Sequence, residues 1–234
     1  AFSGNGKWFA ATSGREVIHV NIEKGTATQR EAGEDRVDFL AFDEPGSVLA
    51  TCDRSGLVRL WDTDSGRQIN SFRANAAQPS RLAFSNSGEL IATSGADKGI
   101  KLWSSRGQLI RHIQKEHRFG VLAFSPTGDR IAGARGKDID WIEIETGKVD
   151  RTFSDGNGGV AGIWISPDGK KLGCVQRGSR ACLWSIEDDR QIAAIEGQTL
   201  ERVDGAAFSP DSTLFAVGGP GRVIRVWDTS TGKT

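Results

Sequence analysis

Residues Leu40 to Asp62 read LAFDEPGSVLATCDRSGLVRLWD, and this stretch recurs along the whole chain. Related stretches begin at Leu82 (LAFSNSGELIATSGADKGIKLW), Leu122 (LAFSPTGDRIAGA), Ile163 (IWISPDGKKLGCVQRGSRACLW) and Ala206 (AAFSPDSTLFAVGGPGRVIRVWD). A divergent copy, AFSGNGKWFAATSGREVIHV, opens the sequence, and successive copies are 40 to 43 residues apart. A fixed period near forty residues indicates stacked units of one kind.

The copy that contains Leu40 predicts four short strands. Residues 37–42 are apolar on both faces, as in a strand that is buried on both sides. Turn residues at 43–46 lead to a second strand at 48–51, and a further turn leads to a third strand at 57–61. Residues 67–72 can form the fourth strand. One antiparallel sheet of this kind cannot cover its own apolar faces, whereas sheets that pack radially on their neighbours can.

These copies resemble the WD40 repeat. The resemblance rests on the AFS-x-x-G turn and on the closing pairs Trp61-Asp62 and Trp227-Asp228, whose place Trp103 and Trp184 share. It implies an all-β fold, a WD40-type β-propeller with six visible repeats of four-stranded antiparallel blades. The repeats run at about 1–35, 36–77, 78–117, 118–158, 159–201 and 202–234.

The two ends of the sequence suggest an incomplete ring. The first copy starts at the end of a first strand and the last copy stops after a third strand. Most propellers of the WD40 family have seven blades. We therefore expect residues 1–234 to be a single propeller domain that is a piece of a larger, seven-bladed parent. The alternative is a six-bladed ring that closes imperfectly.

The chain also departs from the family pattern. The Gly-His pair before the first strand is missing, and its His would fall on Gly33, Lys115 and Thr199. The Asp-His-Ser/Thr-Trp network of the family therefore cannot form as usual, and Asp97 has no His to hold. Ile142 and Val20 stand where other copies carry Trp. We expect apolar packing to replace much of the polar network.

Composition limits the classes of partner and compartment. The chain carries 30 Lys+Arg and 30 Asp+Glu, so binding of nucleic acid through bulk positive charge is not expected. No apolar run is long enough to span a membrane. Three cysteines suit a reducing compartment, and we expect a cytoplasmic protein. Cys174 and Cys182 fall on neighbouring strands and are expected to be reduced, with a strained disulfide as the alternative.

Three motifs that could carry chemistry fail on inspection. His112 and His117 lie in an expected edge strand and loop and do not form a metal-binding pair. Residues 62–66 resemble the start of a calcium loop, but Arg73 stands where the bidentate Glu belongs. Residues 232–234 resemble a phosphate loop, but the required earlier Gly is Trp227. We expect no catalytic residue, no metal and no cofactor.

Arginine recurs at one end of the expected blades. Arg36, Arg118 and Arg202 precede the first strand of alternate copies, with Asp38 and Asp204 two residues beyond the first and last. The turns between second and third strands share that end and contribute Arg54, Arg135, Arg180 and Arg222. These residues either lie in solvated loops of mixed charge or form a binding surface for an acidic partner. The second alternative follows from the ability of Arg to bind a carboxylate through two hydrogen bonds.

The resulting functional expectation is a non-catalytic scaffold or sensor module of a larger protein. Its partner would be a protein or peptide, for example an acidic segment or another domain of the parent, bound around the central channel. Self-association through an open blade edge is a further expectation. The alternative is a propeller enzyme or a small-ligand-binding domain that uses the channel mouth.

Overall fold

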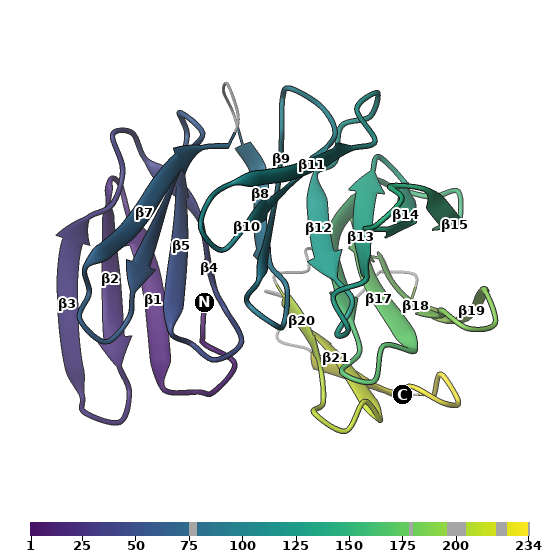
Figure 1. The fold of residues 1–234 in the computed structure, drawn as a ribbon. Helices are drawn as coiled ribbons and strands as arrows, with labels where there is room; N and C mark the ends of the chain where they lie inside the picture. Colours follow the sequence, from purple (N-terminus) through teal and green to yellow (C-terminus); the bar gives the residue numbers. More distant parts are fainter. Residues whose placement is uncertain (75–78, 178–179, 196–204, 219–223, 234) are drawn as a thin grey trace. The chain divides into compact units, whose positions relative to one another are not determined.

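The structure, a computed structural model, describes residues 1–74, 79–177, 180–195, 205–218 and 224–233. Within these ranges the chain forms β-strands and no helix (Figure 1). It divides into two compact units, residues 1–122 and 123–234, with the boundary inside strand β12. Each unit is described by itself below.

Unit one contains three antiparallel sheets in which strands consecutive in sequence pair with each other. Sheet one consists of β1 (Trp8–Ser13), β2 (Glu16–Asn21) and β3 (Thr26–Glu31). Sheet two consists of β4 (Val37–Phe42), β5 (Val48–Asp53), β6 (Leu57–Asp62) and β7 (Gln68–Arg73). Sheet three consists of β8 (Pro79–Phe84), β9 (Leu90–Gly95), β10 (Ile100–Ser104) and β11 (Leu109–Ile113).

Unit two repeats the same plan, and its first sheet begins with the strand that crosses the boundary. Sheet four consists of β12 (Val121–Phe124), β13 (Arg130–Arg135), β14 (Asp138–Glu143) and β15 (Val149–Phe153). Sheet five consists of β16 (Val160–Ile165), β17 (Lys171–Gln176), β18 (Arg180–Ser185) and β19 (Arg190–Ile195). Sheet six consists of β20 (Gly205–Phe208), β21 (Leu214–Gly218) and β22 (Ile224–Asp228).

The predicted strands and turns of the second copy are confirmed almost residue for residue. Gly46 closes the first turn with a φ of +72°, a conformation that glycine adopts without strain. The first and last sheets have three strands each, as the sequence predicts for incomplete copies. Before β1, Phe2 forms an isolated antiparallel bridge with Phe9, which is the remainder of the expected first strand.

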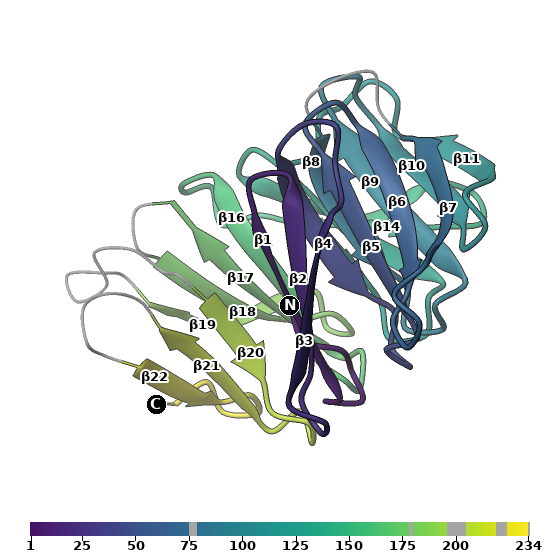
Figure 2. The same ribbon diagram turned by 90° about the vertical axis from the view of Figure 1, so that its left-hand side faces the viewer.

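Within each unit the first strand of each later sheet contacts the sheet before it. In unit one β1 contacts β4 and β4 contacts β8 (Figure 2). In unit two β13 contacts β16 and β16 contacts β20. The apolar cores lie between neighbouring sheets: Trp61 and Val37 pack with Trp8 between sheets one and two, and Trp103 packs with Leu60 between sheets two and three. Each sheet therefore buries both of its faces only by stacking.

The closing position of each four-stranded sheet is marked by an irregularity in pairing. The register between third and fourth strands shifts at Trp61, Trp103, Ile142 and Trp184. Ile142 is fully buried and Trp141 lies one residue before it, so the prediction that Ile142 replaces Trp in its copy is confirmed. A bulge lets one strand turn a bulky side chain into the core while pairing continues on both sides.

Candidate functional site

The sequence-predicted arginine end is formed in unit one around Asp38. The backbone N–H of Arg54 donates to the carbonyl of Arg36 at 2.9 Å, which brings the β5–β6 turn beside the start of β4. The two carboxylate oxygens of Asp38 lie 2.8 Å from Arg36 Nε and 2.9 Å from Arg54 Nε. The arginine side chains are 61% and 54% exposed. One carboxylate thus pairs with two exposed guanidinium groups, through a hydrogen bond from Arg54 and an ion pair with Arg36.

Of the other predicted site residues, the structure describes Arg118 but not those of the last copy. Arg118 is exposed and follows His117, whose carbonyl accepts a hydrogen bond from Gly99 in the β9–β10 turn. Arg118 therefore lies at the same end of its sheet as Arg54. Arg202, Asp204 and Arg222 lie outside the described residues.

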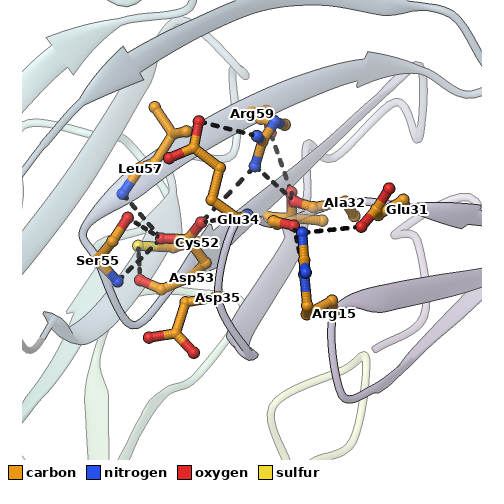
Figure 3. A network of polar contacts seen from close by, with 12 residues as sticks. Arg15, Glu31, Ala32, Glu34, Asp35, Cys52, Asp53, Ser55, Leu57 and Arg59 are labelled. Carbon is orange, nitrogen blue, oxygen red and sulfur yellow. Dashed lines mark hydrogen bonds and ion pairs between the residues drawn. The ribbon is translucent and has the colours of Figure 1, made fainter.

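Behind this end lies a buried polar network centred on Asp53 (Figure 3). The Asp53 carboxylate is fully buried and accepts hydrogen bonds from the Ser55 hydroxyl and from backbone N–H groups, including that of Glu34. Burial raises the pKa of Asp53, but these hydrogen bonds outweigh burial and hold the pKa below its usual range. Arg59 lies 3.6 Å from the carboxylate and donates to the carbonyl of Ala32 at 3.1 Å.

The same arrangement recurs one sheet later with a different cation. Lys101 forms an ion pair with Asp97 and donates to the carbonyl of Ala74 at 2.9 Å. Both cations lie on the third strand of their sheet and reach the chain segment that enters that sheet. Each therefore joins the turn of one sheet to the linker from the previous sheet, and the carbonyl that Arg59 reaches precedes Gly33, the place expected for the family's His.

Sheet four uses the same positions with the charges reversed. Asp140 is 2% exposed on the third strand, and its carboxylate is bound by Arg135 Nε at 2.5 Å and Arg135 Nη2 at 3.2 Å. Thr152 also donates to Asp140, at 2.8 Å. Arg135 is therefore held by a buried acid at the base of its turn, which leaves it less free for a partner than Arg36 or Arg54.

Sheet five places a carboxylate in the linker itself. Asp155 is 5% exposed and lies 2.9 Å from Arg180 Nε. Gln176 donates to it at 2.8 Å and the Cys182 thiol at 3.2 Å. Burial raises the pKa of Asp155, but hydrogen bonds from Gln176, Asn157 and Cys182 and the charge of Arg180 lower it to about 2. Arg180, a predicted partner-binding residue, is mostly buried against this acid.

Comparison with known proteins identifies the repeated unit. The model of the WD domain, G-beta repeat, matches residues 27–62, 66–104 and 190–228. The fold is that of the β-propeller domain of Myceliophteria thermophila Cps50 (Swd1), with a TM-score of 0.83 at 13% identity over all of this chain and 83% of that one. The chain therefore contains WD40 repeats.

Curated relatives share the WD40 repeats within much longer proteins. Telomerase protein component 1 of Mus musculus is 29% identical over 191 residues, which are 75% of this chain and 7% of that protein. Apoptotic protease-activating factor 1 of Rattus norvegicus is 25% identical over 187 residues, which are 79% of this chain and 15% of that protein. The chain thus spans only a small part of these relatives.

The WD40 polar network is rebuilt here rather than lost. Its Trp half persists, since Trp61 Nε1 donates to Thr51 at 3.0 Å and Trp103 Nε1 donates to Thr93 at 2.9 Å. Arg59 and Lys101 replace the missing His. The usual network does not form, as expected, but in sheets two and three a cation on the third strand bonds both the turn and the linker.

Sequence reasoning missed the position that carries this network. It lies two residues before the closing position of each WD40 repeat after the first, and its occupants are Arg59, Lys101, Asp140, Cys182 and Arg225. The signal was present as a polar or polarisable residue in an otherwise apolar third strand. A strand buried on both faces tolerates such a residue only when it is paired.

The remaining residues considered from sequence lie apart from this network. His112 lies in edge strand β11 and contacts the Lys98 carbonyl, and His117 is exposed. The described residues include no group of three or more His, Cys, Asp and Glu that could hold a metal. They also include no helix able to cross a membrane.

The cysteines are free thiols in the core, as the sequence predicts. Cys174 and Cys182 face each other directly across β17 and β18, and both are buried and unbridged. The hydrogen bond with Cys182, together with burial, raises the pKa of Cys174 well above its usual range. Burial also raises the pKa of Cys52 to about 12. A thiol with so high a pKa is a poor nucleophile.

Proposed function

We propose that this chain is a non-catalytic protein-interaction module that binds an acidic segment of a partner protein, or of another domain of its own parent, in the cytoplasm. The binding surface, called the arginine face here, consists of Arg36, Arg54 and Arg118. Arg202 and Arg222 belong to the proposal from sequence alone. The observation that carries it is the sharing of Asp38 between Arg36 and Arg54.

This sharing prepares the two arginines for a carboxylate ligand. Each guanidinium has five N–H donors, and Asp38 is approached by one nitrogen of each. The trio keeps a net charge of +1, so a further carboxylate is attracted. Because Asp38 already restrains both side chains, a ligand loses less side-chain entropy on binding. Each charge-assisted contact could contribute about 1.5–3 kcal/mol.

Arg135 and Arg180 are given a different role in this proposal. Their carboxylate partners, Asp140 and Asp155, are 2% and 5% exposed, so moving either arginine toward a ligand would strand a buried charge. We therefore treat these two arginines as supports of the fold and expect the binding energy to come from the exposed arginines of unit one.

The test is the binding of a fluorescent ten-residue peptide that alternates Glu with Gly, compared with its Gln counterpart. The Arg36→Gln/Arg54→Gln double variant should weaken binding of the Glu peptide at least tenfold. Arg67→Gln, which removes one exposed arginine at the other end of sheet two, is the control and should bind normally. The melting temperature should barely change, because exposed ion pairs contribute under about 1 kcal/mol.

The proposal fails if the double variant binds the Glu peptide as tightly as the unaltered protein does. It also fails if the Gln peptide binds equally well, because binding would then not depend on carboxylates. Added salt should weaken the specific interaction, since the arginines are exposed and screened.

A further inference from the structure

The linker of residues 32–36 joins sheet one to sheet two and carries Arg36 of the arginine face. Asp53, the last residue of β5, is fully buried beside it. One oxygen of its carboxylate, Oδ2, accepts a hydrogen bond from the backbone N–H of Glu34 at 3.0 Å (Figure 3). The position of the linker backbone two residues before Arg36 therefore depends on a side chain of sheet two.

The other oxygen of the same carboxylate holds the β5–β6 turn, which carries Arg54. Asp53 Oδ1 accepts hydrogen bonds from the backbone N–H of Ser55 at 3.0 Å, from the Ser55 hydroxyl at 2.6 Å and from the backbone N–H of Leu57 at 3.1 Å. The turn and the linker are also joined directly, by the backbone hydrogen bond from Arg54 to Arg36. One carboxylate thus fixes both segments that carry the arginines of sheet two.

The linker also packs directly on Asp53. A methyl group on Gly33 would collide with the carbonyl oxygen of Asp35 and would lie only 3.1 Å from the Cβ of Asp53. Any residue with a side chain at this position would therefore push the linker outward. The close approach that brings the N–H of Glu34 to the carboxylate needs a glycine at position 33.

Only a group that accepts on both sides satisfies these donors. An ionised carboxylate accepts through both oxygens, whereas a side-chain amide accepts through its oxygen and donates through its NH₂ group. In Asp53→Asn the NH₂ group would face either the N–H of Glu34 or the N–H groups of the turn. One of the two segments would then lose its hydrogen bonds, although the side chain keeps its size.

We propose that Asp53 positions the arginine face, because its two oxygens hold the linker and the turn so that Arg36 and Arg54 bind an acidic segment as one unit. This role rests on the proposed function, in which the two exposed arginines contact the ligand, whereas Asp53 acts only through the backbone. Side chains that are placed before a ligand arrives lose less entropy on binding. Without Asp53 both arginines remain exposed but are no longer held side by side.

Binding of the Glu peptide measures the effect on the arginine face. Asp53→Asn should weaken this binding at least tenfold, under conditions in which circular dichroism shows that the variant is folded. The matched control is Asp43→Asn at the opposite end of sheet two. Asp43 is 5% exposed and accepts hydrogen bonds from the Ser47 hydroxyl and the Val48 N–H, but it does not contact the linker. Its loss should leave peptide binding unaltered.

NMR of ¹⁵N-labelled arginine side chains tests the same role without a ligand. The Nε–H of Arg54 donates to Asp38 at 2.9 Å, so its exchange with water should be slow, and Arg54→Gln assigns its signal. Asp53→Asn should speed this exchange at least tenfold, and Asp43→Asn should not. If the unaltered protein does not bind the peptide, the proposed function fails, and the Arg54 signal still decides whether Asp53 positions this side chain.

Gly33→Ala is a second variant that keeps Asp53 and every arginine but displaces the linker, so it should also weaken peptide binding. In the unaltered protein, bound peptide should slow exchange of the Glu34 amide and leave that of Val48 unchanged. The proposal is overturned if folded Asp53→Asn binds the peptide as tightly as the unaltered protein or leaves the Arg54 signal unchanged. It is also overturned if Asp43→Asn weakens binding equally, or if bound peptide does not protect the Glu34 amide.

Discussion

Arg59 and Asp140 occupy the same place in the third strands of two different sheets and carry opposite charges. Arg59 pairs across the ladder with Thr51, and Asp140 pairs with Gly133, which holds the matching place on β13. The partner of each residue also has the opposite charge: Arg59 pairs with the acidic Asp53, and Asp140 pairs with the basic Arg135. Both sheets therefore contain a pair of opposite charges at this place, although the positive residue lies on the third strand in one sheet and on the second strand in the other.

The first prediction concerns Asp53. Asp53→Asn should lower the free energy of unfolding by about 2–4 kcal/mol, because it removes a buried charge that accepts several hydrogen bonds and faces Arg59. The control is Asp62→Asn at the less buried end of β6, which should cost about 1 kcal/mol or less. Urea titration followed by tryptophan fluorescence measures both. A loss at Asp53 no larger than that at Asp62 would show that the buried network does not stabilise the fold.

The second prediction concerns acid stability and Asp155. Its pKa is about 2 in the folded chain, against about 3.9 for an unfolded Asp. The folded state therefore binds this proton less readily, and the resulting stability, about 2 kcal/mol, is present above pH 4 and is lost as the pH falls toward 2. Asp155→Asn should remove this part of the acid sensitivity.

The control for Asp155 is Asp189→Asn in the exposed β18–β19 turn, which should keep the acid sensitivity of the unaltered protein. Urea titrations at pH 6, 4 and 3 provide the comparison. Parallel decline in all three proteins would mean that Asp155 does not contribute.

The third prediction compares Trp103 with Trp8. Trp103 is 7% exposed and packs against Phe72 with ring centroids 4.7 Å apart, so Trp103→Ala should cost about 3–5 kcal/mol. The divergence of the first copy would predict a smaller loss for Trp8→Ala. The structure, however, leaves Trp8 only 8% exposed, so we expect the two losses to be similar in urea titration. A clearly smaller loss at Trp8 would indicate a loosely packed first sheet.

The fourth prediction concerns strand β22. Among the described residues it pairs only with β21, and its Ile224 and Val226 are 74% and 41% exposed. Such an unpaired apolar edge favours pairing with another strand, so the isolated chain should self-associate as its concentration rises. Ile224→Lys/Val226→Lys should reduce this association, measured by sedimentation velocity.

Ile69→Lys is the control for β22, since Ile69 is 55% exposed on β7, the outer strand of a complete four-stranded sheet. It should not change association. A chain that remains monomeric at all concentrations would contradict the prediction, as would equal dissociation by the Ile69 variant.

The sequence alone determined the repeat, the strands and the closing positions. These features are encoded locally: apolar runs of strand length, turns with Gly at a fixed offset, and a bulky closing residue every forty or so positions. The replacement of Trp by Ile142 could be predicted for the same reason, because a repeat fixes the place even when the residue changes. The candidate residues of the arginine end were likewise selected by aligning copies.

Only the tertiary structure decided which charges pair. Asp53 meets Arg59 through strand register, and Asp155 meets Arg180 from 25 residues away. Such contacts depend on how far a side chain reaches and on which neighbouring sheet it meets. Sequence periodicity carries the order of the strands, but these pairings arise only once the sheets are stacked.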